Sequence, residues 1–248
     1  MEAGPTLRRV LIIDDDAISL AVAGVLLEAE GCTVVQAESG EEALEWLAGA
    51  AAPDLPDCIL TDLVMPALAG PELASRLRPA APRALLVAMS ASPPPAVEGY
   101  DRVLKKPLSP EALREALALV SESRDRAAGA GGDAPEAEDS DSGVLDSSVF
   151  HRLRRAMSDT GLQEVICAFL EDTAVRIGAM RRGEAAQVMR EAHTIKGGAG
   201  MLGLVQVAAI ASAIEAGIDH HGDRQRKLDA LEFSVRRAEG ILKKRLKI

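Results

Sequence analysis

The stretch Ala-His-Thr-Ile-Lys-Gly-Gly-Ala-Gly at residues 192–200 combines a histidine, a lysine and three glycines in a helical context. Positions three, four and seven residues apart share one helix face, so four of these residues are expected to face outward together: His193, Lys196, Gly197 and Gly200. Because a glycine inside a helix costs about 1 kcal/mol relative to alanine, three of them beside one histidine need a reason. Access is such a reason, since the missing side chain at Gly197 lets a partner's surface reach the imidazole. Lys196 can hold negative charge beside it, and the stretch therefore predicts a histidine that receives a phosphoryl group.

The alternative for this stretch is structural. A lone histidine on a helix is more often a partly buried residue whose small neighbours allow close packing. Here Lys196 and the glycines accompany His193. This combination favours phosphoryl transfer over close packing.

Polar residues also follow the apolar runs in the first half of the chain. They are Asp14 and Asp15 after the first run, Asp62 after the third, Ser90 after the fourth and Lys106 after the fifth. In open parallel sheets, chemistry sits at the carboxyl ends of the strands, so these side chains are expected to converge in one crevice. Three converging carboxylates repel one another unless a cation is present, and hard oxygen ligands suit Mg²⁺.

The same crevice could carry out phosphoryl chemistry. Aspartate is a competent nucleophile toward an activated phosphoryl donor, and a lysine and a hydroxyl could bind the oxygens of the group that it accepts. Each residue alone would be an ordinary loop carboxylate or a member of a salt bridge. All five at strand ends, in this order, favour a functional site.

The elements that must position these residues alternate along the first half of the chain. Apolar strands are expected at 8–15 (ending in the two carboxylates), 33–36, 58–61, 84–89 and 102–104, and helices at 17–30, 39–47, 71–77 and 109–120. Ser39 with Glu42 forms a capping box for the second helix. Continuously apolar strands that alternate with helices indicate a doubly wound, flavodoxin-like α/β fold with a five-stranded parallel sheet.

The rest of the chain is expected to be a linker followed by helices. Residues 122–144 are small and acidic and lack apolar residues before Val144, which predicts a flexible acidic linker. Helices are expected at 147–157, 161–180, from 184 through His193, 204–216 and 224–247. Their short connections indicate antiparallel neighbours in an all-α helical bundle.

Over residues 6–121 the chain closely resembles the receiver domain of two-component response regulators. That resemblance implies that Asp62, in Thr-Asp-Leu-Val-Met-Pro, is the phosphoacceptor. It also implies that Mg²⁺ is bound by Asp14, Asp15, Asp62 and the backbone carbonyl of Val64. Ser90 and Lys106 would contact the phosphoryl group, and Lys106-Pro107 matches the family's Lys-Pro with its cis bond.

Over residues 145–248 the pattern around His193 resembles the histidine phosphotransfer (HPt) domain, including the variant at the front of chemotaxis-type histidine kinases. This second resemblance implies a bundle of four or five helices. Its phosphoacceptor is His193, exposed in mid-helix, with Lys196 beside it.

Two departures from the receiver pattern affect the expected output. The family's aromatic residue three positions before the lysine is Val103 here, and Tyr100 lies three residues too early. Only 15 residues separate Ser90 from Lys106, and three of them are the consecutive prolines 93–95. Because proline opposes helix entry, the helix that the family places there should be reduced or remodelled. Asp62 is therefore expected to pass phosphate onward more than to trigger dimerisation.

Composition narrows the class of partner. Residues 1–120 hold 18 acidic and 9 basic side chains, whereas residues 145–248 hold 13 and 17. Aromatic residues make up only 2% of the chain, so stacking on nucleic-acid bases is not expected, and the scattered basic residues favour an acidic protein partner. The three cysteines are odd in number and far apart, which indicates buried thiols in a reducing compartment. The apolar segment 202–218 contains Gln206 and Glu215 and fits a bundle helix better than a membrane span.

The hypothesis is a phosphorelay intermediate, a monomeric bacterial protein of the cytoplasm. Its partners would be an upstream histidine kinase and a downstream response-regulator receiver, with neither nucleic acid nor membrane involved. It would be a phosphoryl carrier without an ATP-binding kinase core, not an enzyme beyond intrinsic phosphotransfer and autodephosphorylation. Phosphate could flow from Asp62 to His193 or in the reverse direction. The alternative is a binding module, in which the receiver docks on the HPt domain of its own chain and regulates it.

Overall fold

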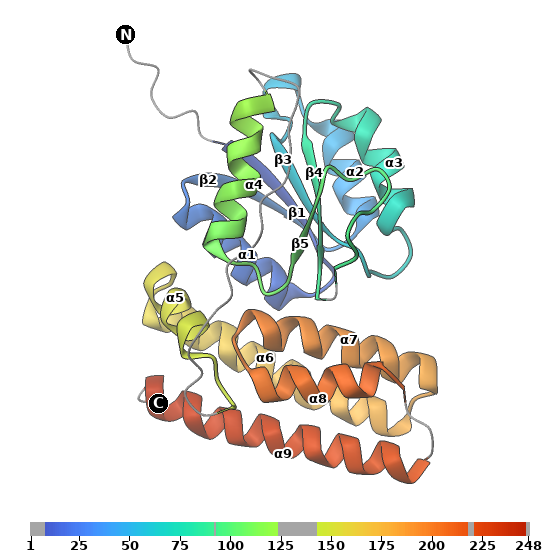
Figure 1. Ribbon diagram of the computed structural model, residues 1–248, viewed down its shortest axis with the longest axis vertical. Coiled ribbons are helices and arrows are strands. Elements are labelled where there is room, and N and C mark those ends of the chain that lie inside the picture. The colour runs from blue at the N-terminus through green and yellow to red at the C-terminus, as the bar shows by residue number, and fades with distance from the viewer. Residues whose placement is uncertain (1–7, 92, 124–142, 218–220, 247–248) are drawn as a thin grey trace. The chain divides into compact units, whose positions relative to one another are not determined.

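The computed structural model describes residues 8–91, 93–123, 143–217 and 221–246. The chain divides into two compact units, Met1–Ala137 and Glu138–Ile248, and each is described here by itself (Figure 1). The predicted linker, residues 122–144, lies for the most part outside the described residues. At its two ends, the last helix of the first unit continues to Ser123, and Val144 is buried.

The first unit is a parallel sheet with helices on both faces. Its strands are β1 (Arg8–Ile13), β2 (Cys32–Ala37), β3 (Cys58–Asp62), β4 (Leu85–Ser90) and β5 (Arg102–Lys105), and its helices are α1 (Ala17–Ala29), α2 (Gly40–Gly49), η1 (Ala52–Asp54), α3 (Gly70–Ala80) and α4 (Pro110–Ser123). All strand pairs are parallel, in the order β2-β1-β3-β4-β5. The predicted doubly wound, five-stranded fold is confirmed.

The helices form two layers that enclose the sheet. Helix α1 contacts α4, and α2 contacts α3, on opposite faces of the sheet (Figure 1). Because both faces are covered, the central strands are apolar in their middle residues, and every residue of 10–13 in β1 is fully buried. On the α2–α3 side, strand residues such as Leu11, Ile59 and Leu86 pack against Leu73 and Leu77 of α3.

The sheet order places the ends of β1 and β3 side by side. Ile13 of β1 pairs with Thr61 of β3, so the residues that follow them, Asp14 and Asp62, leave neighbouring strands at the same edge. Helix α1 begins immediately afterwards, because the buried side chain of Asp16 caps it by accepting hydrogen bonds from the backbone N–H groups of Ile18 and Ser19. This sharp strand-to-helix turn fixes the direction in which the carboxylates leave the sheet.

The connection from β4 to β5 contains no helix in its described residues, 91 and 93–101. The reduction that the prolines predict is confirmed. The Lys106–Pro107 bond that follows β5 is cis, also as expected.

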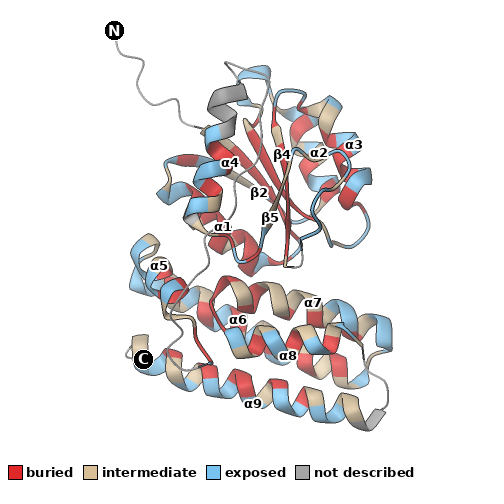
Figure 2. Cartoon of the chain, viewed as in Figure 1, coloured by how far each residue is buried: buried red, intermediate tan, exposed pale blue. Residues whose placement is uncertain are grey.

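The second unit is a bundle of five helices. They are α5 (Ser147–Ala156), α6 (Asp159–Arg182), α7 (Ala185–Met201), α8 (Val205–Glu215) and α9 (His221–Leu246). Helix α6 contacts α7, α7 contacts α8, α8 contacts α9, and α9 contacts α6 in turn. Helix α5 contacts α6. Buried residues recur along the helices of this unit (Figure 2), and most of their side chains are aliphatic. The predicted all-α bundle is confirmed.

The three cysteines differ in their exposure to solvent. Cys32 and Cys58 are buried as expected, but Cys167 is exposed on α6, so the prediction of three buried thiols is wrong at that position. It lies beside Ile166, which occupies the inward-facing stripe of the same helix. Among the described helices, none is both long enough and apolar enough to span a membrane.

Candidate functional site

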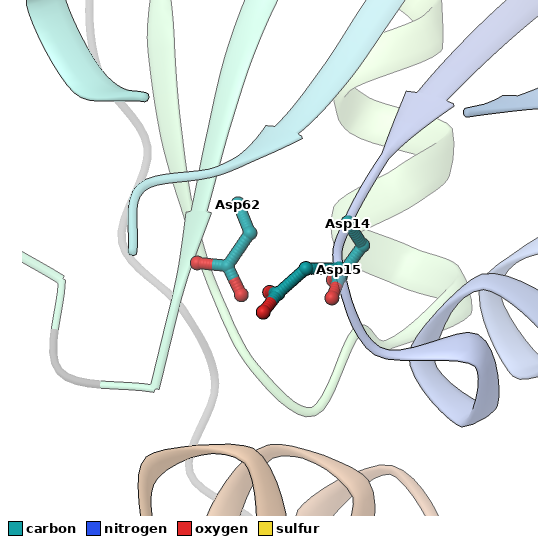
Figure 3. Close-up of side chains that lie close together, drawn as sticks. All are labelled: Asp14, Asp15 and Asp62. Carbon is teal, nitrogen blue, oxygen red and sulfur yellow. The ribbon is translucent and has the colours of Figure 1, made fainter. Parts of the chain in front are cut away.

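Three carboxylates meet at the carboxyl edge of the sheet. Asp14, Asp15 and Asp62 each offer an oxygen atom, and these atoms all lie within 4.8 Å of one another (Figure 3). Asp14 and Asp62 are buried, at 1% and 5% exposure, whereas Asp15 is exposed. The predicted convergence of residues from β1 and β3 is confirmed.

Lys106 joins the two buried carboxylates. Its Nζ lies 2.5 Å from Asp14 Oδ2 and 2.5 Å from Asp62 Oδ2, and its side chain is buried. Burial by itself lowers the pKa of Lys106, but the adjacent charges of Asp14 and Asp62 outweigh it and raise the pKa above its ordinary value. The lysine is therefore a fixed positive charge between the two acids.

The single positive charge of Lys106 does not neutralise three carboxylates. Burial raises the pKa of Asp14 to about 7; the attraction of Lys106 opposes this rise, and the negative charge of Asp62 adds to it. The pKa of Asp15 is raised as well, first by partial desolvation and then by Asp62. An all-oxygen donor set with excess negative charge fits a hard divalent cation.

Two further predicted residues lie around this cluster. The backbone N–H of Val64 donates to Asp62 Oδ1 over 2.9 Å, so each oxygen of the Asp62 carboxylate has a donor. Ser90 is buried at the end of β4, where its carbonyl accepts from the backbone N–H of Lys106 over 2.8 Å. That bond ties the strand that carries the hydroxyl to the residue that carries the ammonium group.

Tyr100 lies three residues before Val103, the position of the family's aromatic residue, and it makes a contact that the sequence does not reveal. Val103 is half-buried on β5. Tyr100 Oη instead lies 3.0 Å from Thr61 Oγ1, directly before Asp62, and donates to the carbonyl of Gly70 over 3.1 Å.

A second site lies on helices α7 and α8. His193 is in the middle of α7, and its Nδ1 lies 2.5 Å from Glu215 Oε1 at the end of α8. Lys196 Nζ donates to the other oxygen of the same carboxylate over 2.9 Å. The histidine side chain is 19% exposed, so it is more covered than the freely exposed imidazole that the resemblance implies.

Buried and partly exposed residues lie on different faces of α7, as the spacing predicts. Val188, Ala192, Ile195 and Ala199 are buried, whereas His193, Lys196, Gly197 and Gly200 are all partly exposed. The histidine therefore shares the accessible side of the helix with Lys196, Gly197 and Gly200, whereas Gly198 is buried.

Glu215 is the site residue that the sequence prediction missed. The sequence does contain one signal for it. Glu215 is an acid near the end of an otherwise apolar helix, and a carboxylate in such surroundings usually needs a hydrogen-bonding or charged partner. Burial tends to raise the pKa of Glu215, but the hydrogen bonds from His193 and Lys196 outweigh it and lower the pKa below its ordinary value. An ionised carboxylate only accepts hydrogen bonds, so a neutral imidazole in this contact carries its proton on Nδ1 and has none on Nε2.

Comparison with known families matches both units. The response regulator receiver domain matches residues 10–118, and the Hpt domain matches residues 164–243. A two-component response regulator of rice (Oryza sativa subsp. japonica) is 37% identical over 118 residues, which are 44% of this chain and 91% of that protein. A gliding motility regulatory protein of Myxococcus xanthus is also 37% identical over 118 residues, but the match spans only 15% of its length.

Solved structures are also similar to part of this chain. The receiver domain of the hybrid histidine kinase CckA is 29% identical, covering 45% of this chain and 97% of that one, with a TM-score of 0.39. The chemotaxis protein CheY4 of Vibrio cholerae is 27% identical, covering 46% and 99%, with a TM-score of 0.41.

The fold, the cluster of three carboxylates and the histidine on α7 together define a two-component signalling protein. The chain belongs to the response regulator receiver family over residues 10–118, and it carries an Hpt domain at residues 164–243. Receiver and Hpt domains are the parts of phosphorelay signalling, and the acidic cluster fits the receiver site.

Proposed function

We propose that this protein is a phosphorelay intermediate in which Asp62 and His193 each carry a phosphoryl group. The observation that carries the proposal is the presence of two nucleophiles in one chain, each within a charged cluster that includes a lysine. Residues 6–121 and 145–248 are proposed as the limits of the two domains. Partners would be a histidine kinase upstream and another receiver downstream.

At the receiver site, a carboxylate oxygen of Asp62 attacks the phosphorus of a phosphohistidine. The P–N bond breaks, and the leaving imidazole keeps its electron pair and takes up a proton. Lys106, 2.5 Å from Asp62, is placed to neutralise the oxygens of the transferred group, and the Ser90 hydroxyl would donate to one of them. Asp14, Asp15, Asp62 and the Val64 carbonyl would hold Mg²⁺, which supplies further neutralisation of the phosphoryl charge when bound.

At the HPt site, Nε2 of His193 attacks the phosphorus of an aspartyl phosphate. The P–O bond to that aspartate breaks, and its carboxylate leaves with the electron pair. Glu215 holds the proton on Nδ1 and stabilises the positive charge that develops on the ring as the P–N bond forms. Lys196 lies on the same face of α7, where it attracts the oxygens of the incoming group.

Two substitutions test the order of transfer. If phosphate enters at Asp62, Asp62→Asn abolishes kinase-dependent labelling of His193, whereas His193→Gln leaves labelling of Asp62 intact. If phosphate enters at His193 from a foreign receiver, His193→Gln blocks labelling of Asp62 by that donor. Labelling of His193 in Asp62→Asn, together with labelling of Asp62 in His193→Gln, contradicts transfer between the two residues within the chain.

The binding module is the second candidate, and charge favours it. Residues 1–120 carry a net charge of −9 and residues 145–248 carry +4, from the acidic and basic counts given above. Regulation by docking predicts a compact state that salt disrupts, with little transfer between Asp62 and His193. Small-angle scattering at low and high salt, together with the labelling assay, separates it from the relay.

A further inference from the structure

Tyr100 is the only tyrosine in the chain, and the receiver pattern assigns it no role. Its ring packs against the core on the α2–α3 side of the sheet. Its hydroxyl lies 3.0 Å from Thr61 Oγ1 and donates to the carbonyl of Gly70 over 3.1 Å. One phenol therefore joins the end of β3, the start of α3 and the connection between β4 and β5.

The backbone on both sides of Tyr100 is fixed. Arg78 of α3 donates to the Gly99 carbonyl over 3.2 Å and to Asp101 Oδ2 over 3.0 Å. Asp101 also exchanges hydrogen bonds with Leu86 of β4, whose N–H donates to Asp101 Oδ2 and whose carbonyl accepts from the Asp101 N–H, each over 2.8 Å. Gly99 has a φ of +85°, and a Cβ atom there would come within 2.8 Å of Ala74 Cβ. The backbone that carries the phenol is consequently held in place by contacts with α3 and β4.

The two residues that Tyr100 joins bracket the segment that carries the receiver chemistry. Between Thr61 and Gly70 lie Asp62 and Val64, whose N–H donates to the Asp62 carboxylate. The Thr61 hydroxyl has a single proton, which it can give to Tyr100 Oη or to the Asp62 carbonyl 3.1 Å away. Because Tyr100 donates its own proton to the Gly70 carbonyl, Thr61 is the donor when the two hydroxyls are hydrogen-bonded. A hydroxyl bonded to both ends of this segment restricts how far it can open, which reduces the reorganisation needed when a cation or a phosphoryl group binds.

We propose that Tyr100 is a positioning residue, which acts through Thr61 and Gly70 to hold the segment 62–69 ready for divalent-cation and phosphoryl binding at Asp62. This inference rests on the function proposed for Asp62. In the described part of the connection between β4 and β5, where no helix is formed, Tyr100 links the connection to the phosphoacceptor strand.

Tyr100→Phe in the full chain tests the proposal, because it removes the hydroxyl and keeps the ring. Titration with Mg²⁺ by calorimetry should give a dissociation constant raised on the order of fivefold, as expected for the loss of a buried hydrogen bond. Labelling of Asp62 by an acyl phosphate at limiting Mg²⁺ should slow by a similar factor. A purely structural tyrosine would lower the urea midpoint and leave the Mg²⁺ affinity of the folded protein unchanged, and that result overturns the proposal.

Thr61→Val removes the other hydroxyl at nearly constant shape and completes a double-mutant cycle. If the two hydroxyls act as a unit, the double variant binds Mg²⁺ no more weakly than Tyr100→Phe alone, whereas additive losses overturn the coupling. Ser75→Ala is the matched control, since the Ser75 hydroxyl of α3 donates only to the carbonyl of its own helix residue Glu72. If Tyr100→Phe fails to fold, Thr61→Val alone must weaken Mg²⁺ binding, and unchanged affinity then counts against the proposal.

Raman spectroscopy adds a readout specific to this residue. Because the chain has one tyrosine, its ring doublet reports directly whether the phenol is hydrogen-bonded in solution. A free phenol overturns the proposal. If the wild-type chain binds Mg²⁺ but takes no phosphate at Asp62, the proposed function fails, and the Mg²⁺ titrations still decide the role of Tyr100.

Discussion

His193 Nδ1 lies 2.5 Å from Glu215 Oε1, although 22 positions separate the two residues in the sequence. The contact joins α7 to α8, and in the proposed transfer it leaves Nε2 as the nitrogen that attacks phosphorus. The second oxygen of Glu215 accepts from Lys196. A single carboxylate thus contacts both the imidazole and the ammonium group beside it.

Glu215→Gln should slow phosphorylation of His193 on the order of tenfold or more, because a neutral amide no longer stabilises the charge that develops on the ring. Transfer from a phosphorylated receiver, sampled by rapid quench, measures the rate. Glu164→Gln is the control, since Glu164 is an exposed glutamate on α6 of the same unit. Equal rates for the two variants would show that Glu215 has no part in the reaction.

Stabilisation of the receiver by Mg²⁺ should increase between pH 6 and pH 8. The pKa of Asp14 is raised by burial from 3.8 to about 7. A raised pKa in the folded state contributes stability that is present below pH 4 and lost as the pH rises through 7. A proton and Mg²⁺ compete for this carboxylate, so the metal restores more stability at the higher pH.

Thermal unfolding with and without Mg²⁺ at the two pH values measures this difference. Asp14→Asn should raise the stability of the metal-free protein at pH 8 and remove most of the pH dependence. A shift in unfolding temperature on adding Mg²⁺ that is the same at both pH values would be inconsistent with the buried acid.

Lys106→Met should destabilise the metal-free receiver by about 3 kcal/mol, because it leaves two buried carboxylates without their cation. The same change should strengthen Mg²⁺ binding, since the ammonium no longer competes for the oxygens. Urea unfolding followed by the fluorescence of Trp46, the only tryptophan, measures the stability. Lys105→Met, at an exposed neighbouring position, should change neither quantity appreciably.

Two glycine substitutions should change the stability of the second unit in opposite directions. Gly203, between α7 and α8, has a φ of +73°, and a Cβ atom there would lie 2.9 Å from Val149 Cβ and 3.1 Å from the Asp146 carbonyl. Gly203→Ala should therefore cost about 1–3 kcal/mol and loosen α5. Gly240 lies in α9 with nothing within 4 Å, so Gly240→Ala should stabilise by about 0.5–1 kcal/mol.

Hydrogen exchange of peptides from α5 and α9 distinguishes these effects. Faster exchange in α5 is expected for Gly203→Ala, and slower exchange in α9 for Gly240→Ala. The same direction of change in both variants would contradict the strain assigned to Gly203.

The sequence predicts those parts of the structure that depend on local pattern. Continuous apolar runs identify the parallel strands, and strand ends place Asp14 near Asp62. The consecutive prolines 93–95 account for the missing helix in the described part of the connection that follows β4. Each of these inferences uses neighbouring residues or a general rule of sheet topology.

Contacts between distant side chains escape the same reasoning. Glu215 and Tyr100 meet partners 22 and 39 positions away, and no local spacing signals either contact. Whether Glu215 reaches His193 depends on how α7 and α8 pack. The position of the Tyr100 hydroxyl depends on how Arg78 and Asp101 fix the backbone on either side of it.

The chemical lability of the phosphate on each residue tests the central claim most directly. After incubation with a phosphorylated cognate histidine kinase and Mg²⁺, the wild-type chain should carry a base-labile acyl phosphate and an acid-labile phosphohistidine. His193→Gln should lose only the acid-labile phosphate. Asp62→Asn should lose the base-labile one and, when phosphate enters at Asp62, the acid-labile one as well, as measured by intact mass after acid or base treatment. Phosphate that resists both treatments, or a chain that remains unlabelled beside an active kinase, would contradict the account.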